Sequence, residues 1–335
     1  MGVTSETGIT AVICTHNRPE LLERALASLV ALDPPASEVL IVDNAPSDDR
    51  TMDLVASKFP GVRYVREDVA GRDFARNRAL AEASQPRVAF MDDDAIADPA
   101  WCGALAAVLR ANPALGACTG RVEPLEVVTE SQRMFEANGG FSQGLAPIRL
   151  PEDMSEPLHG HRAPPIAWAT RMGCGCNMAV RKDLALAIGG FDTALDMGSV
   201  LPGGGDIDML WRLLDAGHGL EYNPGALVLH EHRRDMPSIE RQLVGHQRGL
   251  MACLGKSFVN ARRGTRASIA TYLIWRLAKP LVRVAKRLAG RDPLPVRILL
   301  RMGWNCWVGA FYSYRAGQRE AARRIEAAAA RRIIA

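Results

Sequence analysis

Three consecutive aspartates, Asp92, Asp93 and Asp94, directly follow the apolar run at residues 88–91. Adjacent like charges repel one another, so an anionic cluster at the end of a buried strand is costly unless a cation neutralises it. Mg²⁺ and Mn²⁺ bind carboxylate oxygens and commonly bring a phosphate-bearing ligand with them. The cluster therefore indicates a divalent cation site; a solvated acidic turn that caps the next helix is the alternative.

Other polar side chains follow two earlier apolar runs, at residues 11–15 and 39–42. Thr15, Asn17 and Arg18 end the first run, and their hydroxyl, amide and guanidinium groups suit a ribose, a base or a phosphate. A plain capped turn is the alternative there. Asp43 ends the second run, where its carboxylate could accept hydrogen bonds from a base or a ribose.

A helix is predicted to begin near residue 73, and Arg76 and Asn77 lie in its first turns. Their positions allow two roles, which are bracing the neighbouring loops or contacting a diphosphate. Residues 203–205 are three glycines, and Asp206 follows them at the start of another predicted helix. Asp206 and Asp208 would point about 200° apart on that helix, so only one of them can face a site. Aspartate at a helix start also favours a capping role for Asp206.

These residues need a scaffold that brings the ends of several strands together. Short apolar runs alternate with helical patterns over the first 125 residues, which predicts a parallel, doubly wound α/β sheet. The predicted strands are residues 11–15, 39–42, 62–65, 88–91 and 116–119, and the predicted helices are residues 19–30, 73–83 and 99–109. In such a sheet ligands bind at the carboxyl ends of the strands.

The second half of the chain is less regular. Residues 125–165 are rich in proline and glycine and predict a long loop, which contains His159 and His161. Beyond it, helices are predicted at 182–187 and 206–216, a strand at 226–232, and helices over most of 237–335. His230 and His232 would share one face of that strand. A histidine at a strand end is often structural.

In this order the motifs resemble family 2 glycosyltransferases of the GT-A fold, a Rossmann-like, mostly parallel sheet flanked by helices. The resemblance covers about three quarters of the chain. It rests on CTHNRPE at 14–20, VDNAPSDD at 42–49, GRDFARNRAL at 71–80, MDDDAIADPAW at 91–101, GCGCNMAVRKD at 173–183, GGFD at 189–192, GGGDIDMLWRLLDAG at 203–217 and LVLHEHRR at 227–234.

The resemblance implies a nucleotide-sugar donor, most often a UDP-sugar, and a divalent metal, Mg²⁺ or Mn²⁺. It assigns Asp92 and Asp94 to the metal, with Asp92 or Asp93 also near the ribose, and it adds His230 as a further metal ligand. Asp206 corresponds to the catalytic base, which takes a proton from the acceptor hydroxyl in a single, inverting displacement.

One departure concerns the residue before the base, where the family usually has glutamate and this chain has Gly205. Asp208 remains nearby and is assigned to the acceptor site. Trp168 is assigned there too, because an indole can stack on a sugar face, whereas Trp211 is expected in the core. The acceptor itself could be a glycan, a lipid-linked sugar or a small molecule.

Charge is distributed unevenly along the 335 residues, although the net charge is only +4. Residues 256–335 hold 18 Lys and Arg against three acids, whereas residues 1–255 hold 23 basic and 34 acidic residues. The seven cysteines are scattered without a CxxC pair, which favours a reducing, cytoplasmic setting. No secretory signal or membrane-spanning stretch is recognisable.

The asymmetry predicts two regions, a catalytic domain at 1–255 and a C-terminal helical extension at 256–335. The donor half of the first would be about 1–124 and the acceptor half about 166–255. Residues 268–289 place Arg276, Lys279 and Arg283 at helical spacing against leucines, and aromatic residues follow. This pattern suits peripheral binding to an anionic membrane. Packing on the catalytic domain or in a homodimer is equally compatible, whereas nucleic acid is not expected.

Two other functions compete with sugar transfer. A sugar-nucleotide pyrophosphorylase would need a glycine-rich phosphate loop after the first strand, which CTHNRPE does not provide. A catalytically degenerate nucleotide-sugar-binding protein is compatible with Gly205. The QxxRW motif of processive synthases is missing, since Gln247-Arg248-Gly249 lacks the tryptophan. A non-processive enzyme is therefore expected.

Overall fold

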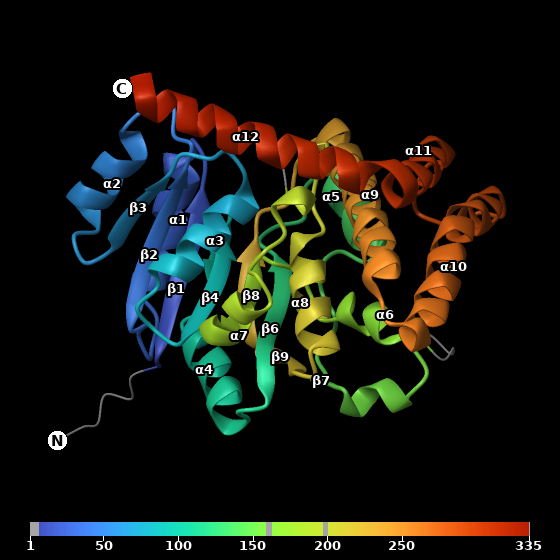
Figure 1. The fold of residues 1–335 in the computed structure, drawn as a ribbon, viewed down its shortest axis with the longest axis horizontal. Helices are drawn as coiled ribbons and strands as arrows, with labels where there is room; N and C mark the ends of the chain where they lie inside the picture. Colours follow the sequence, from blue (N-terminus) through green and yellow to red (C-terminus); the bar gives the residue numbers. More distant parts are fainter. Residues whose placement is uncertain (1–6, 159–162, 197–199, 335) are drawn as a thin grey trace.

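A nine-stranded mixed sheet with helices on both faces organises the protein in the computed structural model, which describes residues 7–158, 163–196 and 200–334 (Figure 1). The strand order is β3-β2-β1-β4-β8-β6-β9-β5, and β7 pairs with β9. The strands are β1 (Ile9–Thr15), β2 (Glu38–Asn44), β3 (Arg63–Glu67), β4 (Arg87–Asp92), β5 (Ala95–Ala97), β6 (Leu115–Pro124), β7 (Ile148–Leu150), β8 (Asn177–Arg181) and β9 (Gly219–His230).

The predicted parallel sheet is confirmed in its first half. β1 pairs in parallel with β2 and β4, while β8 joins β4 in the antiparallel sense. In this register Thr15 lies opposite Asp43, and Cys14 lies opposite Asp92. The polar residues at the three strand ends therefore meet at one edge of the sheet.

Two layers of helices bury the two faces of this sheet. Helices α1 and α4 cover one face with Leu22, Leu26 and Leu105, and α3 and α8 cover the other with Leu80 and Met209 among others. The helices are α1 (Pro19–Val30), α2 (Arg50–Lys58), α3 (Arg72–Glu82), α4 (Trp101–Ala111), α5 (Glu130–Ala137), α6 (Pro165–Ala169), α7 (Lys182–Ala187), α8 (Gly205–Asp215), α9 (Met236–Asn260), α10 (Arg263–Leu288), α11 (Val296–Val308) and α12 (Tyr314–Ile334).

The prediction of a long loop at 125–165 is wrong in part. The segment contains α5, β7 and a 3-10 turn at Glu152–Ser155. Helix α5 begins with a capping box, in which the Gln132 backbone N–H donates to the Thr129 hydroxyl and the Gln132 side chain accepts from the Thr129 N–H. The spacing Thr-x-x-Gln was a readable signal for this helix. His159 and His161 lie outside the described residues.

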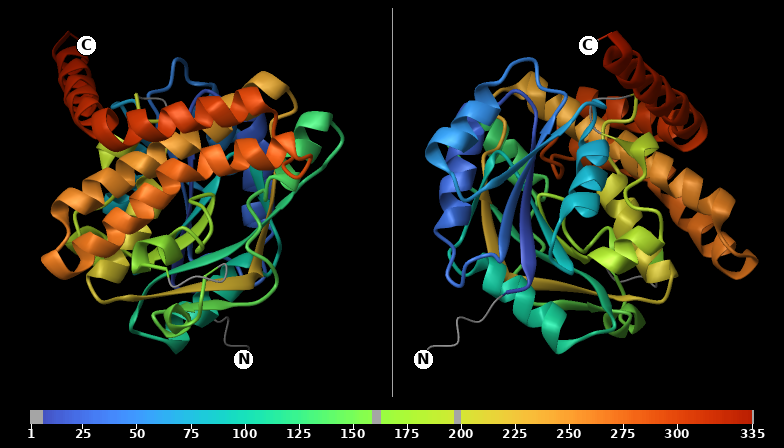
Figure 2. Two further views of the ribbon diagram at one scale, coloured as in Figure 1. Left: turned by 90° about the vertical axis from the view of Figure 1, so that its right-hand side faces the viewer. Right: turned by 60° about the vertical axis from the view of Figure 1, so that its left-hand side comes forward.

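The C-terminal helices form the end of the molecule that faces the viewer in the left panel of Figure 2. Helices α10 and α11 pack on each other and on α9. The boundary predicted after residue 255 falls inside α9, so no linker separates the two regions there. Helix α12 crosses above the sheet (Figure 1). Within the described residues, no helix is both long and apolar enough to cross a bilayer.

Candidate active site

Asp92, Asp94 and His230 converge at the carboxyl edge of the sheet. Asp92 ends β4 and Asp94 follows it, while His230 ends β9 and pairs with Ala95 of β5, which brings its ring to the aspartates. One ligand atom from each of the three side chains lies within 4.8 Å of the others. Two carboxylates and an imidazole are donors that suit Mn²⁺, and the carboxylates also suit Mg²⁺, so this group fits a divalent cation.

The three aspartates experience different electrostatic environments. Burial would raise the pKa of Asp94, but the His230 imidazole, 3.3 Å away, and Arg18 outweigh it and lower the pKa to about 2. Burial and the Asp94 charge raise the pKa of Asp93 to about 6. Asp93 accepts hydrogen bonds from the Thr15 hydroxyl at 2.8 Å and from Arg18 at 3.2 Å. Thr15 and Arg18 therefore hold the aspartate cluster in place.

Two arginines of α3 lie beside Asp92. The Arg72 guanidinium is 3.1 Å from Asp92, and that of Arg76 is 3.8 Å away. Arg76 is buried and also donates to Asp73 and to the Gly175 carbonyl, so it braces the site. Arg72 is 29% exposed and is therefore the arginine placed to meet an anionic ligand. Arg72 was not predicted as a site residue, although its position directly after Gly71, at a helix start, was a signal.

Asp206 lies in the first turn of α8 and is linked to Asp92 through Gly175 and Arg76. Its carboxylate accepts hydrogen bonds from the Gly175 and Ile207 backbone N–H groups, both at 2.9 Å. Burial would raise the pKa of Asp206, but the charges of Arg76 and Arg72 and these two N–H donors outweigh it and lower the pKa. Asp206 is thus anionic at neutral pH, as a proton acceptor must be.

Gly205 stands where the family usually has glutamate, and the carboxylate of Asp73 lies beside it. A Cβ atom built on Gly205 would lie 1.9 Å from the Asp73 carboxylate oxygen Oδ2. Burial raises the pKa of Asp73 to about 7, against the opposing charge of Arg76. A carboxyl group from α3 thus occupies the space that a side chain at residue 205 would need, next to Asp206.

Asn17 and Asp43 lie at the same edge of the sheet. The Asn17 side chain accepts hydrogen bonds from the Ser47 backbone N–H at 2.9 Å and from the Ser47 hydroxyl at 3.1 Å. Asp43 is buried and accepts a hydrogen bond from the Tyr64 hydroxyl at 2.9 Å. Its oxygen Oδ1 has no donor among the described residues. A ligand hydroxyl or base N–H would satisfy this oxygen.

Three predicted contacts with ligands disagree with the structure. Asn77 exchanges both of its amide hydrogen bonds with the Phe191 backbone, so it has the bracing role rather than the donor-binding one. Trp168 is only 6% exposed and lies in the core, so its ring is not available to stack on a sugar. The sequence pattern could not distinguish these buried positions from exposed ones.

Asp208 is the third of these residues. Its carboxylate is 0% exposed and forms ion pairs with Arg212 at 2.6 Å and with Lys256 at 2.7 Å. Both oxygens are occupied, which argues against an acceptor-site role. Because Lys256 belongs to α9, its ion pair with Asp208 helps to hold α9 against the start of α8. Lys256 also binds Asp192 at 2.6 Å. Trp211 is buried in the core, as expected.

A chain of side chains extends from the metal-ligand candidate His230 away from the aspartates. His230 Nδ1 lies 3.2 Å from His232 Nδ1, and His232 Nε2 lies 2.8 Å from the Glu136 carboxylate. Burial and the charge of His230 lower the pKa of His232 despite the Glu136 contact. Glu136 lies on α5 and was missed, because the sequence predicted a loop there.

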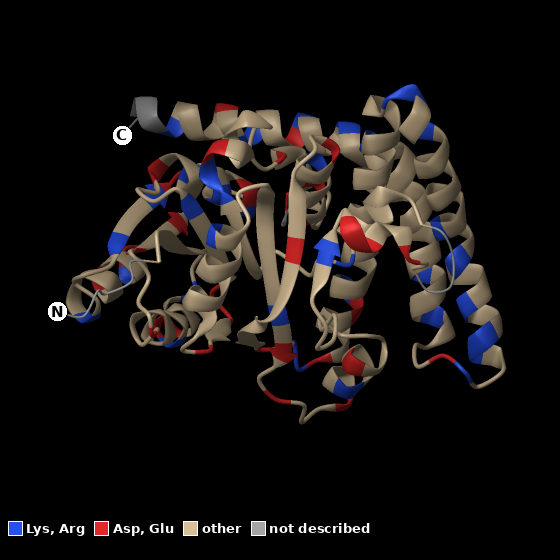
Figure 3. Ribbon diagram, turned by 90° about the horizontal axis from the view of Figure 1, so that it is seen from below, with Lys and Arg blue, Asp and Glu red and all other residues tan. Residues whose placement is uncertain are grey.

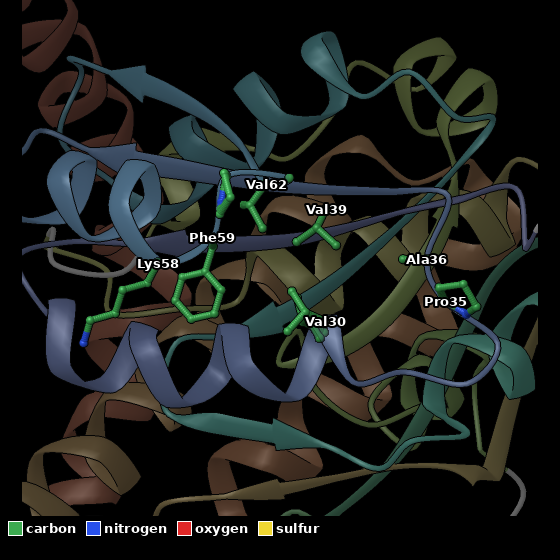
Figure 4. A pocket seen from close by; sticks show the side chains of 10 residues that line it. Val30, Pro35, Ala36, Val39, Lys58, Phe59 and Val62 are labelled. Atoms are coloured by element: carbon green, nitrogen blue, oxygen red, sulfur yellow. The ribbon is translucent and has the colours of Figure 1, made fainter.

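A separate surface hollow of about 410 Å³ lies near the amino ends of β2 and β3, between the end of α1, the start of β2 and the turn before β3 (Figure 4). Val30, Val39 and Phe59 line it, and Lys58 is its one charged lining residue. Lys58 pairs with Glu23 at 2.6 Å. The hollow is unrelated to the carboxyl edge and offers no polar groups that converge on a ligand.

The sheet order and the acidic site at its carboxyl edge define the GT-A glycosyltransferase fold. The structure aligns with that of a mannosyltransferase from Pyrobaculum calidifontis in complex with GDP-Man and Mn²⁺, with a TM-score of 0.55. The alignment covers 97% of this chain and 86% of that chain at 20% sequence identity. At 20% sequence identity this alignment shows that the two proteins share a fold and nothing more.

The chain belongs to glycosyl transferase family 2, whose family model matches residues 10–189. The pre-mycofactocin glycosyltransferase of Mycobacterium tuberculosis is 25% identical over 236 residues, which cover 69% of this chain and 44% of that protein. The glucosyl-dolichyl phosphate glucuronosyltransferase of Haloferax volcanii is 26% identical over 189 residues, which cover 55% of this chain and 56% of that protein. The chain thus spans about half the length of these two relatives.

Proposed function

We propose that this chain transfers a sugar from a nucleotide-sugar donor to an acceptor hydroxyl with inversion of the anomeric centre. The observation that carries the proposal is the convergence of Asp92, Asp94 and His230 within 4.8 Å, beside Arg72. A mannosyltransferase of the same fold forms a complex with GDP-Man and Mn²⁺, which accords with a donor and metal of these kinds.

The donor diphosphate would bind at this edge of the sheet. Asp92, Asp94 and His230 would hold Mg²⁺ or Mn²⁺, which offsets the charge that develops on the departing diphosphate. Arg72 would contact the same phosphates from the start of α3. Asp43 would accept hydrogen bonds from the base or ribose through its unpaired oxygen. Asn17 and Arg18 would border the nucleotide.

Asp206 would act as the base on the opposite side of the reacting sugar. Its low pKa in the ligand-free protein depends on Arg76 and Arg72. The ionised carboxylate would be ready to accept the proton of the acceptor hydroxyl.

Release of nucleoside diphosphate from a panel of UDP-, GDP- and dTDP-sugars with Mn²⁺ tests this proposal. We expect the wild-type protein to hydrolyse one donor class slowly, and Asp206→Asn to lower the rate by about 10²–10⁴-fold. Asp215→Asn, an exposed change at the end of the same helix, is the matched control. If none of the three proteins releases nucleoside diphosphate from any donor of the panel, the result would favour a catalytically degenerate binding protein and overturn the proposed enzymatic activity.

A further inference from the structure

The outward face of α10 is apolar along most of the helix. Between Ala267 and Ala285, every exposed residue of α10 is uncharged. The large members of this set are Ile274, Trp275, Leu281 and Val282, and Leu288, 78% exposed, follows them near the end of the helix. Residues seven apart lie on one side of a helix, so these side chains form a single stripe.

The basic residues in the middle of α10 are only partly exposed and lie off this stripe. Arg276 donates to the Gln247 side chain at 2.9 Å, and Arg283 binds Asp292 at 2.7 Å. Lys279 lies over the Trp275 ring, 5.0 Å from its centroid. The charges in the middle of α10 are therefore engaged with neighbouring residues.

A second exposed stripe lies on α11 and on the π-helical turn Gly309–Ser313 that follows it. Leu300, Trp304, Trp307 and Phe311 recur every three or four residues, and Trp304 is 71% exposed. The two helices approach closely where a Cβ on Gly303 would lie 3.3 Å from Pro280. They lie side by side at the end of the molecule shown in the left panel of Figure 2.

The charge around these stripes is almost entirely positive. Residues 256–319 contain 14 Lys and Arg and one acid, Asp292, which is buried against Arg283. Exposed basic residues lie at both ends of α10, namely Arg262, Arg263 and Arg266 at one end and Lys286, Arg287 and Arg291 at the other. In Figure 3 blue bands recur along these helices at the right of the view.

This chemistry distinguishes two occupants of the surface. A second copy of the chain would bring two positive surfaces together, which repel each other. An anionic bilayer attracts the basic ends, and tryptophan and tyrosine side chains favour the headgroup boundary. A helix with an apolar outer stripe lies in the plane of that boundary.

We propose that α10, α11 and the following π turn form a docking surface for bilayers that contain anionic phospholipids. The side chains of Trp275, Trp304 and Trp307 enter the headgroup boundary, and the basic ends of α10 bind lipid phosphates. This inference is independent of the sugar-transfer reaction, since none of its residues belongs to the site at the sheet edge.

Flotation of the full chain with vesicles tests the surface directly. We expect binding to vesicles of equimolar phosphatidylcholine and phosphatidylglycerol, weaker binding to pure phosphatidylcholine, and weakening by salt. Trp304→Ser combined with Trp307→Ser should lower the partition coefficient by about tenfold or more. The matched control, Val128→Ser combined with Leu145→Ser, removes exposed apolar side chains elsewhere and should bind as the wild type does.

Three results would overturn the proposal. The first is that the wild-type protein binds to neither kind of vesicle. The second is equal binding by the tryptophan variant, with circular dichroism showing that both proteins are folded. The third is light scattering that shows a dimer in the wild type and a monomer in the tryptophan variant, because the stripes would then be an interface between copies.

Discussion

We expect Glu136 to determine, through His232, which nitrogen of His230 would be free to bind a metal. A carboxylate accepts a hydrogen bond, so Glu136 would hold a proton on His232 Nε2. Neutral His232 then accepts at Nδ1, which places a proton on His230 Nδ1. The Nε2 atom of His230, which faces Asp94, is left with the lone pair that a metal requires.

We expect Glu136→Gln to weaken Mn²⁺ binding by about 10–100-fold while the fold is retained. The amide NH₂ can donate to His232 Nε2, which would reverse the tautomers and put a proton on His230 Nε2. Titration of Mn²⁺ followed by electron paramagnetic resonance measures the affinity, and ¹⁵N NMR reports the tautomers. Glu231→Gln is the control, because Glu231 pairs with Arg24 instead. Unchanged affinity and tautomers in Glu136→Gln would refute the relay.

Asp73 and Gly205 form a second pair whose residue types depend on each other. Gly205→Glu alone should be strongly destabilising, because its Cβ would collide with the Asp73 carboxylate in a buried place. Asp73→Ser in the same chain removes that carboxylate and should restore part of the lost stability, roughly 1–3 kcal/mol of coupling. Thermal unfolding of the two single variants and the double variant gives this energy. Purely additive effects would show that the two positions are independent.

At the scale of elements, helix α12 reaches the donor side of the site through one arginine. Arg324 donates to the Ala70 carbonyl at 2.9 Å and to Asp196 at 3.0 Å, and Asp196 accepts in turn from the Asp73 backbone N–H. Asp196 is 0% exposed, so its charge depends on these contacts. The C-terminal helix therefore fixes the loop that precedes α3.

Arg324→Ala should lower the free energy of unfolding by about 2–3 kcal/mol, because it leaves the buried Asp196 carboxylate without this cation. It should also expose α12 to protease before the sheet is cut. Arg323→Ala, an exposed change on the same helix, should alter the free energy by less than about 0.5 kcal/mol. Urea unfolding and limited proteolysis measure both effects. Equal stability of the two variants would mean that α12 is not anchored through Arg324.

The elements themselves were largely predictable from the sequence. The helices at 19–30 and 182–187 have the predicted bounds, because proline at a helix start and apolar spacing are local signals. Helix α2 was missed, since two buried residues, Thr51 and Val55, give little periodicity. The acidic cluster at Asp92–Asp94 was predicted from its position after a strand, whereas His230 was added through the family resemblance, and the structure brings Asp92, Asp94 and His230 together. Trp168 and Asp208 were misassigned, because their burial depends on the packing of α6 on α8 and of α9 on α8.

At the scale of the whole molecule, the sheet joins residues that are distant in the sequence into one acidic edge. Asp43, Asp92 and His230 come from three strands, and the arginines of α3 offset their charge. The basic helices lie at a different end of the molecule and carry the exposed aromatic stripes. The proposed donor site and the proposed docking surface thus occupy separate regions.

The central claim is that Asp92, Asp94 and His230 hold a metal that binds the donor's diphosphate. Calorimetric titration of the full chain with nucleoside diphosphates, with and without Mn²⁺, tests it most directly. We predict that one diphosphate binds only when Mn²⁺ is present, and that Asp94→Asn weakens this binding by at least about tenfold. Metal-independent binding of equal strength in the wild type and Asp94→Asn would contradict the account.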